Sequence, residues 1–320
     1  MAKLSLLTMV QTACAEMGLP QPVSMTNASD TLAVQMLALA NREVQDCIRL
    51  GGQAGGWQEL RAQYTFNVQS TGLITNCSYT AGSNVITIGT PATQAPQVGW
   101  AVCTSGGANG TGFQYPTYVT NVAGSTITVS NNATQTNTNT SMAFGQESYS
   151  LPSDYDFMID RTQWDRGYRW QLLGPMTPQE WQVLKSGLSP TGPRRRWRLM
   201  NNLFYVDPIP YDSNLLVYEY YSANGVIDNS NPSVPVTKAL FTSSTDTYQL
   251  PDQNLILGLI WRYRRAKGLD YTQEYDVWKR MVDENLARDT GSQDLALDSQ
   301  ASGVRFISDM NIPDTGYGTT

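Results

Sequence analysis

The chain of 320 residues contains no histidine. Histidine is the commonest general base and the commonest metal ligand, so its absence excludes every Ser-His and Cys-His nucleophile pair. Only carboxylate or lysine chemistry stays open to an enzyme. Cysteine is also scarce, and its four positions show no CxxC spacing, so a zinc site is not expected. These positions are Cys14, Cys47, Cys77 and Cys103. The first two fall on apolar helical faces and are predicted to be buried free thiols, whereas the last two could pair.

Charged side chains are missing from one long segment. From Ala62 to Gln146, 85 consecutive residues include no Asp, Glu, Lys or Arg, although the chain carries 21 basic and 27 acidic residues. Such a change in composition predicts a chain of two parts. The formal net charge of −6 argues against nucleic-acid binding by charge neutralisation, which requires a basic surface.

Long hydrophobic runs are absent as well. No segment approaches 18 apolar residues in a row, and the apolar run at the N-terminus is broken by Gln11, Thr12 and Glu16. We therefore expect a soluble protein without a membrane span or a secretion signal.

Helical periodicity appears in five segments. Apolar residues recur at helical spacing over residues 3–17 and again after a cap at Asn27, Ser29 or Asp30, ending at Gly51-Gly52. These two segments predict a helical hairpin. Pro178 to Lys185 has the signature of a capping box with Thr177 and Glu180. Two further helices are predicted from Asp252 to Gly268 and over residues 271–288.

Strand patterns occupy much of the remainder. Alternating apolar residues from Leu60 to Val68 predict a strand with one buried apolar face, and this strand leads into the uncharged segment. That segment has short β-branched runs separated by Gly, Asn, Ser and Pro, typical of a small all-β unit of about six strands. Asn201-Asn202 predicts a type I′ turn between two strands, and Leu215 to Tyr221 predicts a third.

Two clusters of charged residues are candidate sites. Asp154, Asp156, Asp160 and Asp165 lie close in sequence, as paired catalytic carboxylates would. However, Leu151 to Asp154 predicts a turn into a further helical segment with Ser153 or Asp154 as its cap, and Asp165 is expected to pair with Arg161 or Arg166. The densest basic segment consists of Arg194, Arg195, Arg196, Trp197 and Arg198. It fits either a phosphate contact with a stacking tryptophan or, as the net charge favours, contact with an acidic protein surface or with solvent.

The strings Tyr149–Arg161, Thr162–Arg166, Leu173–Trp181 and Leu257–Tyr271 resemble head-to-tail adaptor proteins of tailed bacteriophages, also called connector or tail tubular protein A-like proteins. The resemblance extends over the helical hairpin and most of residues 147–290. Within the uncharged segment, Asn76–Ile88, Val98–Val102, Gly112–Val122 and Ala123–Ala133 look like a small β module that recurs in phage tail and virion proteins.

This resemblance implies an α+β fold, with a helical-bundle core and a small antiparallel sheet, interrupted by an inserted all-β domain. We expect residues 1–60 and 147–290 to form the discontinuous helical domain, with a β-hairpin sheet at about 195–250. Residues 61–146 would be the insert, and 291–320 an extended C-terminal tail.

The resemblance also implies a structural, non-enzymatic virion protein with no cofactor and no metal. It would form a ring, twelve-fold in the short-tailed phages, at the head–tail junction, after synthesis in the host bacterial cytoplasm. Its partners would be the portal ring, neighbouring adaptor subunits, and tail nozzle or fibre proteins, with no membrane. Genomic DNA would pass through the channel during ejection without specific binding.

In this family the end of the chain commonly docks against the portal or an adjacent subunit. The best-clustered apolar anchors of the tail are Val304, Phe306, Ile307 and Ile312, with Arg305 among them. One alternative is a tail-associated binding protein whose β module contacts a fibre or a host glycan through Trp100, Tyr115 and Tyr118. Another is a carboxylate hydrolase of the virion.

Overall fold

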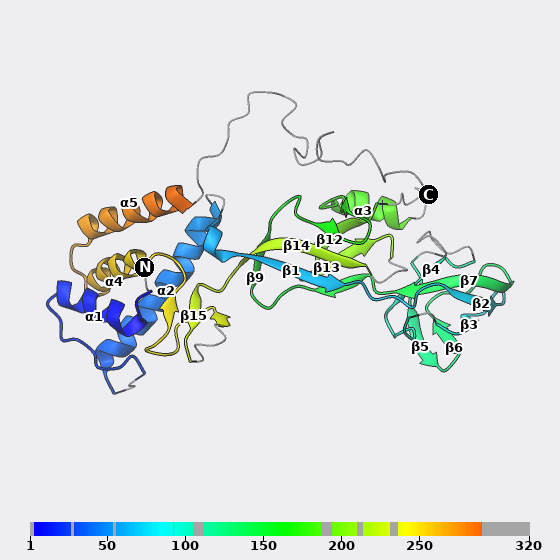
Figure 1. Ribbon diagram of the computed structural model, residues 1–320, viewed down its shortest axis with the longest axis horizontal. Helices are drawn as coiled ribbons and strands as arrows, with labels where there is room; N and C mark the ends of the chain where they lie inside the picture. Colours follow the sequence, from blue (N-terminus) through cyan, green and yellow to red (C-terminus); the bar gives the residue numbers. More distant parts are fainter. Residues whose placement is uncertain are drawn as a thin grey trace, which may run out of the picture.

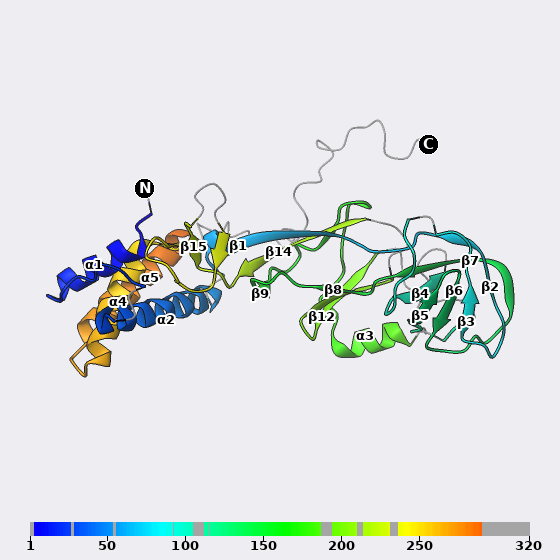
Figure 2. The ribbon, with the colours of Figure 1, turned by 90° about the horizontal axis from the view of Figure 1, so that it is seen from below.

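The computed structural model describes residues 3–26, 29–53, 56–91, 93–104, 112–114, 116–186, 194–209, 214–230 and 236–289. The protein is elongated, with four helices and a small sheet at one end, two sheets in the middle and a six-stranded sheet at the other end (Figure 1). The helices are α1 (Leu6–Glu16), α2 (Thr31–Gln53), α3 (Pro178–Lys185), α4 (Asp252–Ala266) and α5 (Thr272–Asp289). Turned by 90°, the view shows β1 and β14 running from the helical end toward the six-stranded sheet, with α3 beside the middle sheets (Figure 2).

The expected helical-bundle core is wrong. The described residues contain 17 strands in four sheets and only five α-helices. The strands between residues 148 and 248 account for the difference, because many have only two to four residues and are too short to show a period in the sequence. The chain is therefore β-rich, with a helical unit at one end.

Two sheets form the middle of the molecule. The larger has the order β1-β14-β10-β11, with β9 also paired to β14, and the smaller has the order β12-β13-β8. Their strands are β1 (Arg61–Asn67), β9 (Tyr155–Met158), β10 (Trp164–Asp165), β11 (Trp170–Gln171), β14 (Leu215–Ser222), β8 (Ser148–Ser150), β12 (Arg196–Met200) and β13 (Leu203–Asp207). An aromatic core joins them, in which Phe204 stacks on Trp197 at 5.4 Å and on Tyr218 at 5.2 Å between ring centroids.

The six-stranded sheet is nearly closed into a barrel. Its strands follow the order β4-β7-β2-β3-β6-β5, and the two edge strands approach each other where Val119 and Trp100 share a backbone hydrogen bond of 2.8 Å. Closure protects both edges and encloses an apolar core of its own. The strands are β2 (Ile74–Tyr79), β3 (Val85–Thr87), β4 (Ala101–Thr104), β5 (Val119–Ala123), β6 (Thr126–Val129) and β7 (Asn137–Gly145).

The helical unit packs four helices around one apolar core, with a three-stranded sheet against it. The core draws side chains from α1, α2, α4 and α5 and includes Phe241 and Tyr248. The sheet has the order β16-β15-β17, and its strands are β15 (Val226–Asp228), β16 (Val236–Lys238) and β17 (Thr247–Tyr248). None of the helices in the described ranges is long and apolar enough to cross a lipid bilayer.

Several local predictions are confirmed. The Asp30 carboxylate accepts hydrogen bonds from the backbone N–H groups of Leu32 and Ala33, so Asp30 caps α2. Thr177 and Glu180 form the predicted capping box of α3. Asn201 and Asn202 have φ angles of +52° and +57°, as a type I′ turn requires, and join β12 to β13. The predicted helical segment after Asp154 is wrong, since Tyr155–Met158 is strand β9.

Candidate interaction surfaces

The basic segment of residues 194–198 divides into buried and exposed parts. Trp197 is 1% exposed and stacks in the central core, so it offers no surface for a base or a partner. Arg195 is also buried, and its Nη1 donates to the Asp165 carboxylate at 2.6 Å. Arg194 is exposed, and Arg196 and Arg198 are half-buried. Within residues 194–198, therefore, only Arg194, Arg196 and Arg198 are accessible to another molecule.

Asp165 organises the turn between β10 and β11. One carboxylate oxygen accepts the backbone N–H groups of Gly167 and Tyr168 at 2.9 and 3.0 Å, and the other binds Arg195. The expected ion-pair partners Arg161 and Arg166 are therefore replaced by a residue 30 positions away. The Arg195 guanidinium also lies over the Tyr168 ring, 5.6 Å from its centroid. Each of these contacts restrains the turn.

An exposed aromatic pair projects from this turn. Tyr168 and Trp170 are 39% and 38% exposed, and their rings stack at 5.6 Å with 24° between the planes. Exposed Leu173 follows two residues after β11, and Arg166 and Arg169 are exposed in the turn. This surface was not predicted from the sequence. The combination of Asp165 with Gly167, typical of a turn in which an aspartate accepts backbone N–H groups, is the signal that could have found it.

Of the remaining aspartates, Asp154 has defined partners in the fold. Asp154 accepts hydrogen bonds from the Tyr220 hydroxyl at 2.8 Å and the Ser222 hydroxyl at 2.7 Å, so it fastens the start of β9 to β14 rather than capping a helix. Burial and the nearby Asp154 raise the pKa of the Tyr220 hydroxyl. Asp156 and Asp160 are exposed. The two aspartates with defined partners thus serve the fold.

A polar network joins the barrel to the middle of the molecule. The Tyr118 hydroxyl, from the barrel, donates to Glu147 at 2.8 Å, and the Lys185 ammonium binds both Glu147 and Asp207. The three charged side chains are at most 10% exposed, so they are shielded from water. Next to this network, Ile209 packs against the outer face of β4 and β7. These contacts set the orientation of the barrel.

The aromatic residues suggested for glycan contact do not form such a surface. Trp100 is 4% exposed and belongs to the barrel core. Tyr118 is half-buried and donates to Glu147. Tyr115 lies outside the described residues, as do the tail anchors Val304, Arg305, Phe306, Ile307 and Ile312.

The four cysteines are buried free thiols, so Cys77 and Cys103 do not pair. Burial raises the pKa of the Cys103 thiol to about 12. The ranges that the structure describes contain no group of three or more Cys, Asp or Glu side chains placed to hold a metal ion.

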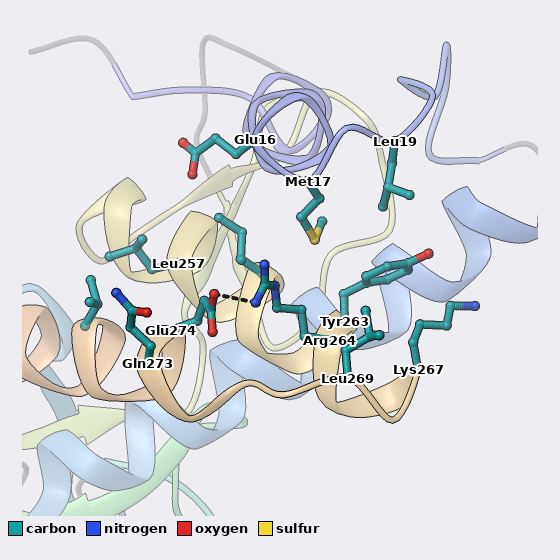
Figure 3. Close-up of a pocket in the computed structure, with 12 residues that line it drawn as sticks. Glu16, Met17, Leu19, Leu257, Tyr263, Arg264, Lys267, Leu269, Gln273 and Glu274 are labelled. Carbon is teal, nitrogen blue, oxygen red and sulfur yellow. Dashed lines mark ion pairs between the residues drawn. The ribbon is translucent and has the colours of Figure 1, made fainter.

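A pocket of about 550 Å³ opens at the far end of the helical unit (Figure 3). Met17 and Leu19, just after α1, point toward Tyr263 of α4, and the Arg264–Glu274 ion pair links α4 to α5. Leu269, in the turn between these helices, is 55% exposed. Apolar side chains with a charged rim suit a protein contact better than a small charged ligand.

The helical unit also contains a buried charge network. The Glu43 carboxylate, 0% exposed, accepts hydrogen bonds from Arg262 Nε at 2.5 Å and from Trp278 Nε1 at 2.6 Å. Arg262 Nη2 also donates to Asp46 at 2.9 Å. Burial raises the pKa of Glu43, while the charge of Arg262 opposes this shift. The network joins α2, α4 and α5.

An elongated, β-rich chain whose polar clusters serve internal packing has the character of a structural protein. The comparison with known families agrees: the model described as SU10 adaptor protein matches residues 117–305, more than half of the chain. Its class is that of the phage adaptors, which are structural components of the virion. The chain belongs to the SU10 adaptor protein family. No curated protein matches it.

The family match covers some parts of the molecule and not others. It begins at Thr117, before β5 of the barrel, and includes every strand of the middle sheets except β1, together with α3, α4 and α5. The exposed turn at Tyr168 and the polar network at Lys185 both lie within the matched residues. The N-terminal helices α1 and α2 lie outside the match.

Proposed function

We propose that this phage adaptor acts at the head–tail junction, as a ring of twelve subunits below the portal. The ring would prolong the DNA channel and provide a platform for the tail nozzle or fibres. The observation that carries the proposal is the match to an adaptor family over residues 117–305. We also propose the division into a discontinuous domain of residues 1–60 and 147–290, an insert of residues 61–146 and a tail from residue 291.

Shape and charge support this role. The three parts of the molecule lie in a row, so a subunit can contact different partners at its two ends (Figures 1 and 2). A net charge of −6 suits a channel through which DNA passes without adhering, because like charges repel. The charge-free barrel lacks the charged groups that would steer ionic ligands and is compatible with close lateral packing.

The test is to mix the purified chain with a portal ring and determine the mass of the products. We expect a stoichiometric ring-on-ring complex. A tail-associated binding protein or a hydrolase would leave the portal ring unchanged in mass, and that result would exclude the proposal.

Burial decides which arginines of residues 194–198 are suitable for replacement in a test of portal binding. Neutralising Arg195 would break a buried ion pair and disturb the fold, so the informative variant is Arg194→Gln with Arg198→Gln. We expect weaker assembly with the portal, as for loss of rim charges in an interface. Arg288→Gln, at an exposed arginine on α5, is the matched control. Unchanged assembly by the double variant would show that the segment is only solvated.

The tail is the second part of the proposal. Deletion of residues 290–320 should abolish portal binding while the far-UV circular dichroism of the helices and sheets is retained. Normal portal binding by the shortened chain would assign the portal contact to the described residues instead.

A further inference from the structure

The turn between β10 and β11 has the composition of a protein-binding surface. Of the eight tryptophans in the chain, Trp170 is the exposed one, since the other seven are buried or half-buried. It stacks on Tyr168, with Leu173 and two exposed arginines beside it. Tryptophan, tyrosine and arginine are the residues that most often dominate binding energy in interfaces.

The turn is also held in place before any partner binds. Asp165 accepts two backbone N–H groups of the turn and the Arg195 side chain, and Arg195 lies over the Tyr168 ring. A side chain at Gly167 would meet Asn214, so the turn packs closely on the chain beneath it. A restrained surface loses little conformational entropy on binding.

The charge around the turn identifies its partner. Arg166 and Arg169 are exposed in the turn, whereas the acidic residue beside them, Asp165, is buried and paired with Arg195. The opposite balance is found after α5, where residues 290–320 carry four aspartates and one arginine. Two of these aspartates, Asp294 and Asp298, flank the apolar pair Leu295 and Leu297. That segment offers negative charge together with apolar side chains.

The end of α5 lies within reach of the turn. The Asp289 carboxylate accepts the backbone N–H of Gln58 at 2.5 Å, just before β1 begins. At its other end, β1 pairs with Leu215, whose carbonyl accepts the Arg166 backbone N–H at 2.9 Å. The length of β1 is about 20 Å, and β14 and β10 add about 10 Å to one side. Nine extended residues after Asp289 span about 30 Å, so Asp298 can reach the turn.

We propose that the Arg166–Trp170 turn is the docking site for the acidic segment of the same chain. Asp298 lies between Arg166 and Arg169 and pairs with both, and Leu297 covers the Trp170 ring. This contact does not depend on a portal, and it holds the tail against the middle of the subunit until a partner displaces it.

The test uses the full chain and the burial of its own cysteines. Because all four native thiols are buried, a cysteine introduced by Ser299→Cys can be labelled selectively with bimane, whose fluorescence a contacting tryptophan quenches. We expect quenching that Trp170→Phe relieves. We also expect Arg166→Gln with Arg169→Gln to lower the ratio of docked to free tail about fivefold, as loss of two exposed ion pairs would. High salt should act in the same direction.

Controls separate this contact from others. Leu269→Ser changes the pocket in Figure 3 and should leave the quenching as it is; relief by this variant would place the tail in that pocket and overturn the proposal. Quenching that persists after Trp170→Phe would also overturn it. Quenching should be independent of protein concentration, and a rise with concentration would assign the tail to a second copy. Since no portal is present, failure here is distinct from failure of ring assembly.

Discussion

Replacement of Arg262 by methionine should destabilise the helical unit strongly. Arg262 is the cation that faces the buried Glu43 carboxylate, and it also binds Asp46. Removal of one partner from a buried ion pair leaves an uncompensated charge and costs about 3–5 kcal/mol. Methionine keeps much of the apolar length of arginine, so the loss reports the charge rather than a cavity. We expect a decrease of that size in the free energy of unfolding at pH 7.

The loss should depend on pH in a defined direction. Burial raises the pKa of Glu43 in the folded chain, so the native state binds its proton more tightly than the unfolded state does. Stability therefore falls as pH rises from the unfolded pKa through the folded pKa. Without Arg262 the folded pKa rises further. The destabilisation is then complete above that pKa and becomes smaller as the pH falls through it.

Urea unfolding followed by tryptophan fluorescence and circular dichroism, at pH 7 and pH 5, measures both effects. Arg265→Met, at an exposed arginine on the same helix, is the control and should change stability little. Adding Glu43→Gln to Arg262→Met should recover much of the loss, because the buried charge is then gone as well. A loss below about 1 kcal/mol, or one of equal size at both pH values, would refute the reasoning.

Three further predictions concern other parts of the chain. Gly258→Ala should destabilise the chain despite the better helix propensity of alanine, because the new Cβ would lie 2.2 Å from the Glu43 carboxyl carbon. Gly52→Ala is the control and should be tolerated, since its nearest neighbour, a ring carbon of Phe157, would lie 3.4 Å from the new Cβ. Thermal unfolding of the two variants measures the difference. The four thiols should react with a disulfide reagent only on denaturation, since burial raises the pKa of Cys103 to about 12; rapid reaction of the native chain would contradict this. Tyr118→Phe removes the hydroxyl that donates to Glu147 and should lower the free energy of unfolding by about 1 kcal/mol. Amide hydrogen exchange should become faster where the barrel joins the middle sheets. Exchange equal to that of the unchanged chain would show that the network does not hold the barrel.

Local signals in the sequence predicted local structure correctly. The capping box at Thr177 and the asparagine pair at Asn201-Asn202 act over two to four residues, and both appear in the structure as expected. The long helices were predictable for a similar reason, because a helix of 15 or more residues repeats its apolar face several times. The six strands of the uncharged segment were predictable as a group, because Gly, Asn, Ser and Pro residues separate their β-branched runs.

The overall class of the fold was not predictable in this way. Strand β1 pairs with β14, where Arg61 lies opposite Tyr221, 160 residues later, and no local pattern specifies that partner. Strands of two to four residues, such as β9 and β10, are stable only through such long-range pairs, here with β14. The expectation of a helical-bundle core therefore underestimated the sheets between residues 148 and 248.

The candidate interaction surfaces were likewise only partly predictable from the sequence. The sequence determined that basic side chains concentrate near residues 194–198, that charge is absent from residues 62–146, and that no histidine is available for chemistry. The tertiary structure decided which arginines stay at the surface, by pairing Arg195 with Asp165 and burying Trp197 on Phe204. It also brought Tyr168 and Trp170 together outside the core. Composition is a property of the chain alone, whereas burial depends on what each side chain meets when distant segments pack.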